Sequence, residues 1–319
     1  MNGLRENVVW GIIAAITIAV VVVFLPIAFG VMPNRFFEHS CSISRSLGTQ
    51  FGCYRFLWNT VTTGVFIGII GPIIGMFLVH RGMALIGETL AHTAFAGVAF
   101  GTLIIGASGW DFRLLLVAIA VAVIGAAGVQ VLADRTESYG DVPTAIMLTG
   151  SFAIGTLFID LGGGFAFVDI NSYLFGNIAI TDDRSVALMA VLTLAVVLTV
   201  IVFYKPLVYI TFDEEAAHVA RFNVSGYNGL LVILTALVIV GAMQILGVIL
   251  VAAMLVIPVA AASLIANSFQ HALYTSVVIG VFSVLSGISV SWIHELRPGA
   301  TIVVIAICVY LLSVLASGR

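Results

Sequence analysis

Long apolar runs separated by short polar connections dominate the chain. Within each run, apolar residues continue over roughly 20 positions without the alternation of a β-barrel strand, which is the pattern of membrane-spanning helices. Because backbone groups inside lipid must pair internally, the pattern predicts an all-α integral membrane protein, a polytopic bundle of nine or ten transmembrane helices. We expect these helices at residues 8–31, 57–79, 83–107, 112–134, 143–162, 183–205, 228–244, 246–266, 271–292 and 299–317.

The first apolar run, Val8–Val31, is longer than the apolar core of about 7–15 residues that a signal peptide carries. We therefore predict a retained helix rather than a cleaved leader. The polar stretch that follows contains Cys41 and Cys53. They would form a disulfide if this loop faces an oxidising exterior, and two free thiols fit the sequence equally well. Residues 1–56 are thus predicted to be an extra transmembrane helix with a cysteine-containing loop, extracytoplasmic if the cysteines are oxidised, ahead of a main transmembrane domain at 57–319.

Two connections differ from simple loops. Residues 161–181 contain three consecutive glycines and the run NSYLFGNI, which is too short to span a bilayer. This predicts a re-entrant or interfacial helix that is buried against protein. Residues 211–227 form the most charged stretch of the chain, with Glu and Ala at its centre. Since these residues favour helix, we expect a short helix outside the membrane there.

Glycines recur four residues apart in the first part of the main domain. Such spacing lets helix backbones approach closely in membranes, and packing within one subunit is enough to explain it. The pairs are Gly64 and Gly68, Gly71 and Gly75, and Gly97 and Gly101.

Composition agrees with a lipid environment and narrows the partners. The chain is 61% hydrophobic and 8% charged, whereas a soluble domain is about 25% charged. The net charge of −3 argues against nucleic acid as a partner. Orientation stays open at this level, because lysine and arginine divide evenly between the two sets of loops.

Glu88 and His92 form the clearest candidate site. They lie four apart within one apolar helix, so both side chains project from the same face. Ionisable groups in a membrane helix are costly and usually functional. A carboxylate beside an imidazole suits Zn²⁺ and also Mn²⁺, although two ligands do not complete a metal shell. A buried Glu–His hydrogen bond without metal, or a proton relay, fits the same spacing.

The chain carries no recognised catalytic motif. It has no GxxxxGK[ST] P-loop and no GxSxG, and the HExxH pattern that begins at His294 and Glu295 is interrupted by Pro298. We therefore predict a transport protein rather than an enzyme. The alternative is a proton-coupled secondary carrier with Glu88 and His92 as its proton relay, although the paired repeats of such carriers are not evident.

Four sequence blocks resemble the permease subunits of zinc and manganese ABC importers, the ZnuB-like permeases. Together the blocks fall within residues 57–317, and the first and third are the more specific. They are RGMALIGETLAHTAFAGVAFG (Arg81–Gly101), DINSYLFG (Asp169–Gly176), AMQILGVILVAAMLVIPVAAA (Ala242–Ala262) and RPGATIVV (Arg297–Val304).

The resemblance implies a homodimeric, multi-pass permease of the plasma membrane that imports a divalent metal ion. A partner ABC ATPase subunit would supply ATP hydrolysis, and an extracytoplasmic metal-binding solute-binding protein would deliver the ion. Residues 211–227 would then be cytoplasmic, with a coupling helix at Asp213–Val224. The residues implied to dock on the ATPase are Asp213, Glu214, Glu215, Ala216, Ala217 and Arg221.

The resemblance also assigns the ion pathway. The family's acidic-x-x-x-His pair falls on Glu88 and His92, which are thereby implied as metal ligands. No permanent cofactor is implied, since the metal is the transported substrate. Zinc is the metal we expect first, and manganese and iron fit the same pair. The chain departs from the family in having Glu88 where aspartate is usual and Asn223 where a glycine commonly closes the coupling helix, and residues 1–56 have no clear counterpart.

Overall fold

The computed structural model describes residues 34–46, 51–108, 117–125, 127–128, 142–161, 176 and 183–317. The expected first helix at 8–31 lies outside the described residues, as do nearly all of the 161–181 connection and part of the expected helix at 112–134.

Within the described residues the protein is built of helices, which confirms the all-α prediction. Seven of them are long and apolar enough to cross a membrane, and an eighth span is formed if the bent pair α8–α9 is counted as one. Their ends agree with the expected ranges to within about four residues. In chain order the elements are α2 (Asn34–Ser46), η1 (Phe51–Cys53), α3 (Arg55–His80), α4 (Ala84–Ser108), α6 (Val142–Leu161), α8 (Asp183–Val202), α9 (Tyr204–Phe212), α10 (Glu214–Val219), α11 (Val224–Leu246), α12 (Val248–Ile265), α13 (Phe269–His294) and α14 (Pro298–Ser317).

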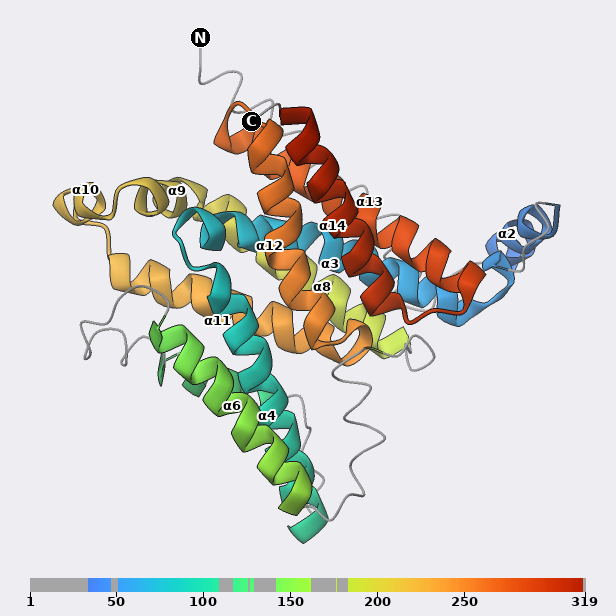
Figure 1. Cartoon of the computed structure of the whole chain (residues 1–319), viewed down its shortest axis with the longest axis horizontal. Helices are drawn as coiled ribbons and strands as arrows, with labels where there is room; N and C mark the ends of the chain where they lie inside the picture. The colour runs from blue at the N-terminus through green and yellow to red at the C-terminus, as the bar shows by residue number, and fades with distance from the viewer. Residues whose placement is uncertain are drawn as a thin grey trace.

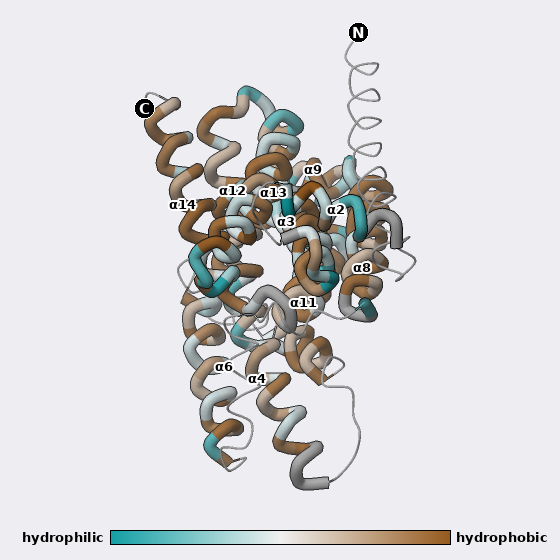
Figure 2. Tube along the Cα trace, turned by 90° about the vertical axis from the view of Figure 1, so that its right-hand side faces the viewer, coloured by the Kyte–Doolittle hydropathy of each residue, from teal (hydrophilic) through white to brown (hydrophobic). Residues whose placement is uncertain are grey.

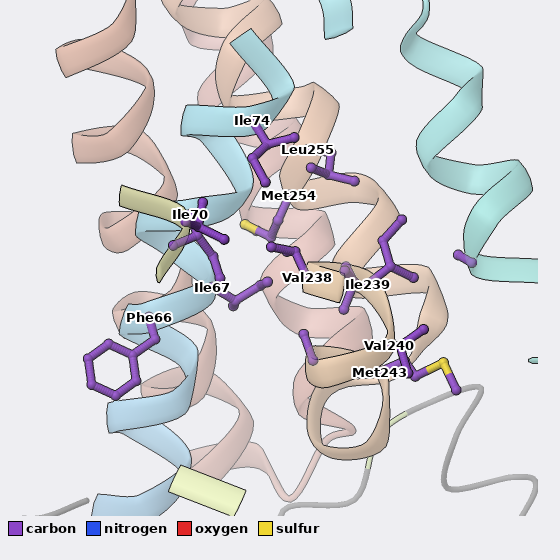
Figure 3. Close-up of a cluster of buried hydrophobic side chains, with 14 of the residues drawn as sticks. Phe66, Ile67, Ile70, Ile74, Val238, Ile239, Val240, Met243, Met254 and Leu255 are labelled. Carbon is purple, nitrogen blue, oxygen red and sulfur yellow. The ribbon is translucent and has the colours of Figure 1, made fainter. Parts of the chain in front are cut away.

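Helix α3 is the centre of the bundle. It is apolar all round, and its most apolar 18-residue window is entirely buried inside the protein. Helices α8, α11, α12 and α13 pack around it. Figure 3 shows Ile67, Ile70 and Ile74 of α3 facing Met254 and Leu255 of α12, with side chains of α11 beside them.

Close backbone contacts explain the spaced glycines of α3. A Cβ atom added at Gly75 would overlap the carbonyl oxygen of Leu255 on α12, and one added at Gly280 on α13 would lie 2.5 Å from the carbonyl oxygen of Gly68. These helices therefore touch through their main chains. The packing lies within one subunit, as expected from the sequence.

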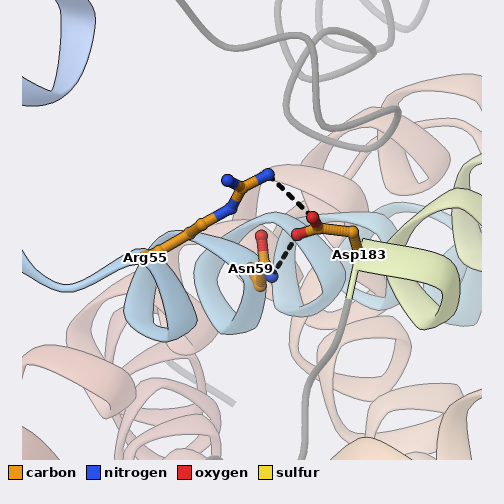
Figure 4. A network of polar contacts seen from close by, with 3 residues as sticks. All are labelled: Arg55, Asn59 and Asp183. Carbon is orange, nitrogen blue, oxygen red and sulfur yellow. Dashed lines mark hydrogen bonds and ion pairs between the residues drawn. The ribbon is translucent and has the colours of Figure 1, made fainter. Parts of the chain in front are cut away.

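One end of α3 carries the cysteine loop. Cys41 of α2 and Cys53 of η1 are joined in a disulfide. The sequence had allowed either this bond or two free thiols. Beside it, Arg55 donates a 2.7 Å hydrogen bond to Asp183 at the start of α8, and Asn59 donates to the other oxygen of that carboxylate at 3.0 Å (Figure 4). The arrangement ties α2, α3 and α8 together at this end of the molecule.

The opposite end of α3 carries α9 and α10, as Figure 1 shows. Because α3 has 26 residues, the two ends are about 39 Å apart along its axis. In Figure 2 the apolar, brown tube predominates along the long helices, while much of α2 is hydrophilic. The bundle is thus apolar over a length that fits a bilayer, with two chemically different polar ends.

The expected helix at 183–205 ends three residues early, at a break that the sequence did not predict. Helix α8 ends at Val202, and α9 leaves it at an angle of 70° after Phe203. Pro206 accounts for the break, because a proline in a continuous helix would clash with the carbonyl of Val202, four residues earlier, and has no N–H to bond it. The chain is thereby redirected before the charged stretch begins.

Candidate functional site

A tight reversal between α3 and α4 positions the candidate site. Gly82 adopts the left-handed conformation with φ of 69°, its N–H donates to Val79, and the N–H of Met83 donates to Leu78. This is the Schellman pattern that ends a helix, and glycine is the residue that adopts its left-handed position without strain. The reversal fixes where α4 begins, at Ala84, and so where its side chains project.

Glu88 and His92 lie near this end of α4. They are four and eight residues beyond Ala84, which places them about 6 Å and 12 Å along the helix axis. Glu88 is exposed on the surface of the single chain, and its carboxylate has no hydrogen bond or ion pair among the residues that the structure describes. A lone carboxylate on a spanning helix is unfavourable against lipid, so this face requires water, a cation or another protein surface.

His92 is half-buried beside Glu88. Its ring meets Phe152 of α6 edge-on, with the centroids 5.2 Å apart, and Phe152 in turn stacks on Phe95 at 5.8 Å. The Nδ1 atom of His92 is buried and has no hydrogen-bond partner among the described residues. Buried polar atoms are normally hydrogen-bonded, so an orphan of this kind calls for an explanation.

Hydrogen bonds between buried hydroxyl groups hold the Glu88 and His92 face of α4 in a fixed position relative to α6. The Thr89 hydroxyl donates to the carbonyl of Thr144 at 3.1 Å, and the Thr93 and Ser151 hydroxyls are 3.0 Å apart. All four residues are buried. Thr89 and Thr93 directly follow Glu88 and His92, so their contacts with α6 fix the rotation of α4 about its axis and with it the direction in which the acid and the imidazole project.

The described residues of one chain supply only part of a metal shell. Among them, no group of three or more His, Cys, Asp or Glu side chains is arranged to hold a metal ion. The pair on α4 therefore offers one carboxylate and one imidazole, with the remaining positions open. Such a pair can contact a cation and release it, which a closed four-ligand site does poorly.

The charged connection forms a short helix, as expected, but with different bounds. Helix α10 covers Glu214–Val219 rather than 213–224, and the Asp213 side chain caps it by accepting a 2.8 Å hydrogen bond from the Ala216 N–H. Arg221 adopts the left-handed conformation, with φ of 61°. Asn223, which we expected in that role, instead caps α11 by accepting from Gly226. Of the nine residues between the two capping side chains, six are helical, and the left-handed turn at Arg221 and the Asn223 cap redirect the chain into α11.

The two faces of α10 differ. Ala217 is fully buried against Ile210 and Val224, so it holds the helix to its own subunit. Val219 is 85% exposed, although it is apolar. Glu215 and Arg221 are also exposed. The outer face of α10 therefore combines an apolar side chain with charged ones and is available for contact with another protein.

Sequence reasoning assigned no role to the residues that connect these two regions. Arg81, in the α3–α4 reversal, donates a 2.6 Å hydrogen bond to Asn228 on α11 and lies 3.8 Å from the Glu214 carboxylate on α10. Phe152 beside His92 was missed as well. The signal available in the sequence was Arg81 itself, a charge between two apolar helices, but its partners lie well over 100 residues away.

Comparison with known proteins gives consistent matches. The model of the ABC 3 transport family matches residues 53–317. The manganese transport system membrane protein MntC of Halalkalibacterium halodurans is 33% identical over 264 residues, covering 83% of this chain and 88% of that protein. The manganese import system permease protein ScaB of Streptococcus gordonii is 28% identical over 260 residues, covering 82% and 91%.

A solved structure is similar as well. PsaBC from Streptococcus pneumoniae in complex with Fab contains a chain that matches with a TM-score of 0.73 and 29% sequence identity. The match covers 82% of this chain and 91% of that one. Sequence and fold therefore agree over the same large share of the chain.

Proposed function

Because the chain belongs to the ABC 3 transport family, as a multi-pass membrane permease of a metal ABC importer, we propose that its cargo is manganese(II) and that Glu88 and His92 contact the ion. The observation that carries the site is an exposed carboxylate one turn from an imidazole whose Nδ1 has no partner among the described residues. Both groups lie on one face of a membrane-spanning helix.

Manganese replaces zinc as the metal we favour. The sequence alone put zinc first, whereas MntC and ScaB are named for manganese. The ligand chemistry supports the change, since carboxylate oxygens suit Mn²⁺ and a single imidazole is compatible with it. The absence of cysteine from the pair also removes the soft ligand that would favour zinc.

A homodimer would complete the site. One chain offers two ligands and leaves Glu88 exposed, so a two-fold axis along this face of α4 would bring four ligands together. Burying Glu88 against a second copy and a passing cation also removes the cost of a lone carboxylate in the membrane. Because Mn²⁺ favours octahedral coordination, four protein ligands would still leave positions for water, and these allow the ion to enter and leave.

The α10 end is proposed to face the cytoplasm and dock on an ABC ATPase. The exposed Val219 and its charged neighbours support this assignment. The disulfide between Cys41 and Cys53, about 39 Å away along α3, then faces the oxidising exterior, where disulfides persist. An extracytoplasmic solute-binding protein would deliver the ion at that end.

Transport by the purified permease–ATPase complex in proteoliposomes tests the function. We expect ATP-dependent accumulation of ⁵⁴Mn²⁺ when the metal-loaded solute-binding protein is supplied, and little accumulation of ⁶⁵Zn²⁺. Uptake driven by a proton gradient without ATP would contradict the importer and favour the secondary carrier. Accumulation of zinc but not manganese would contradict the choice of cargo alone.

Val219→Asp is expected to weaken ATPase binding about 30-fold, because a charge replaces an apolar contact of hot-spot size, about 2 kcal/mol. Affinity between the detergent-solubilised permease and the purified ATPase subunit measures the effect. Ile43→Asp is the matched control, since Ile43 is 50% exposed at the opposite end of the molecule. Unchanged affinity for Val219→Asp would remove α10 from the interface.

A further inference from the structure

Arg81 joins three elements at one point. Its Nη2 atom lies 2.6 Å from Oδ1 of Asn228 in the first turns of α11 and 3.8 Å from Oε2 of Glu214 in the first turn of α10. Arg81 itself belongs to the reversal from which α4 begins. The guanidinium therefore connects the short external helix to the base of the helix that carries Glu88 and His92.

The guanidinium is enclosed rather than solvated. Only 8% of the Arg81 side chain is exposed, whereas 53% of the Glu214 side chain is exposed. Burial lowers the pKa of Arg81 below its ordinary value, and the Glu214 carboxylate acts in the opposite direction. A buried cation is costly unless it is paired and hydrogen-bonded, so its partners are held close to it.

Other contacts link α10 to the bundle but not directly to α4. Helix α10 packs against α9 and α11, and extended packing between α10 and α4 is not found among the described elements. Phe212 of α9 contacts Phe269 of α13, at 5.4 Å between ring centroids, and the ring of His80 at 6.2 Å. These aromatic contacts hold α9 to the ends of α3 and α13. The polar link through Arg81 leads from α10 to the C-cap of α3, three residues before α4 begins.

We propose that Arg81 is a positioning residue that transmits the movement of α10 to α4, so that displacement of the external helix moves the face carrying Glu88 and His92. Arg81 lies seven residues before Glu88, and the hydrogen-bonded reversal at Gly82 restricts the movement of the segment between them. The inference rests on the proposed function, because it assumes that α10 is moved by an ATPase.

The decisive measurement is the number of metal ions transported per ATP hydrolysed by the reconstituted permease–ATPase complex. For Arg81→Gln we expect an intact complex and ATP hydrolysis within about twofold of wild type, with ions transported per ATP reduced about tenfold, the scale of a typical coupling between two sites. Arg81→Lys, which keeps the charge but not the planar fork, should recover part of the coupling.

Asn228→Ala removes the shorter of the two contacts without disturbing the reversal, and it serves if Arg81→Gln does not fold. Glu214→Gln is not used, because Glu214 also belongs to the surface implied to dock on the ATPase. Arg55→Gln is the matched control, because it breaks an arginine–carboxylate pair at the opposite end of α3 and should leave the coupling ratio unchanged.

Two outcomes would overturn the proposal. A wild-type ratio of ions to ATP in Arg81→Gln and Asn228→Ala would show that the link transmits nothing. A parallel fall of assembly, hydrolysis and transport in these variants, without recovery in Arg81→Lys, would show a structural role alone. If the wild-type complex itself fails to transport metal, the proposed function fails instead, so the two failures are distinguishable.

Discussion

Replacement of His92 by alanine is expected to reduce manganese uptake about 100-fold. Loss of a residue that merely supports a ligand commonly costs 10–100-fold in metal affinity or activity, and His92 is proposed as a ligand itself. The reduction corresponds to about 2.7 kcal/mol of lost stabilisation of the ion along its path. Initial rates of ⁵⁴Mn²⁺ uptake, corrected for the amount of assembled complex, measure it.

Glu88 allows a finer test of the same site. Glu88→Gln keeps the side-chain volume but removes the negative charge, so we expect a loss comparable to that of His92→Ala. Glu88→Asp keeps the carboxylate with a shorter reach, and should retain most of the uptake with an altered preference between manganese and zinc. A response to volume rather than charge would indicate packing instead of coordination.

Matched controls separate the site from general effects of charge and of histidine. Asp160 is an exposed carboxylate on the spanning helix α6, and His271 is an exposed histidine in the first turn of α13. Asp160→Asn and His271→Ala should leave uptake within about twofold of wild type. Full uptake in both Glu88→Gln and His92→Ala would remove the pair from the mechanism.

Helix existence was predictable from the sequence, but the place of each helix in the bundle was not. Helix α3 was expected at 57–79 and is found at Arg55–His80. The most apolar stretch of α3 is fully buried inside the protein, whereas that of α14, which is more apolar, is only 22% buried. Lipid and protein interior are equally apolar, so hydropathy cannot distinguish a central helix from a peripheral one. The spaced glycines of α3 were the sequence feature related to its central position, because they allow close contact with α12 and α13.

In the candidate site, too, some features were predictable from the sequence and others were not. Helical period alone placed Glu88 and His92 on one face, because that relation is local. Phe152, which meets the His92 ring, and Asn228, which accepts from Arg81, lie on other helices and become neighbours only through tertiary packing. The bounds of α10 were missed for another reason, since capping by Asp213 and Asn223 competes with helix continuation and a composition of Glu and Ala does not reveal it.

Substitution of Gly75 is expected to have the largest effect on stability. A Cβ atom there overlaps the backbone carbonyl of Leu255, and a backbone atom cannot move aside as the end of a flexible side chain can. Overpacking a tight core typically costs 1–3 kcal/mol, and Gly75→Ala should lie at or above the upper end of this range. We expect the apparent Tm of the detergent-solubilised protein to fall by about 6–12 °C, and Gly75→Leu to prevent assembly of the bundle.

Gly150→Ala gives the matched control for the Gly75 prediction. Gly150 also lies within a spanning helix, α6, but a Cβ atom added there meets nothing within 4 Å. Alanine is the better helix former by about 1 kcal/mol, so this variant should keep or slightly raise the apparent Tm. Equal Tm values for the two variants would contradict direct main-chain contact between α3 and α12. If Gly75→Ala alone is destabilised, the membrane bundle depends on that contact, which apolar composition by itself does not provide.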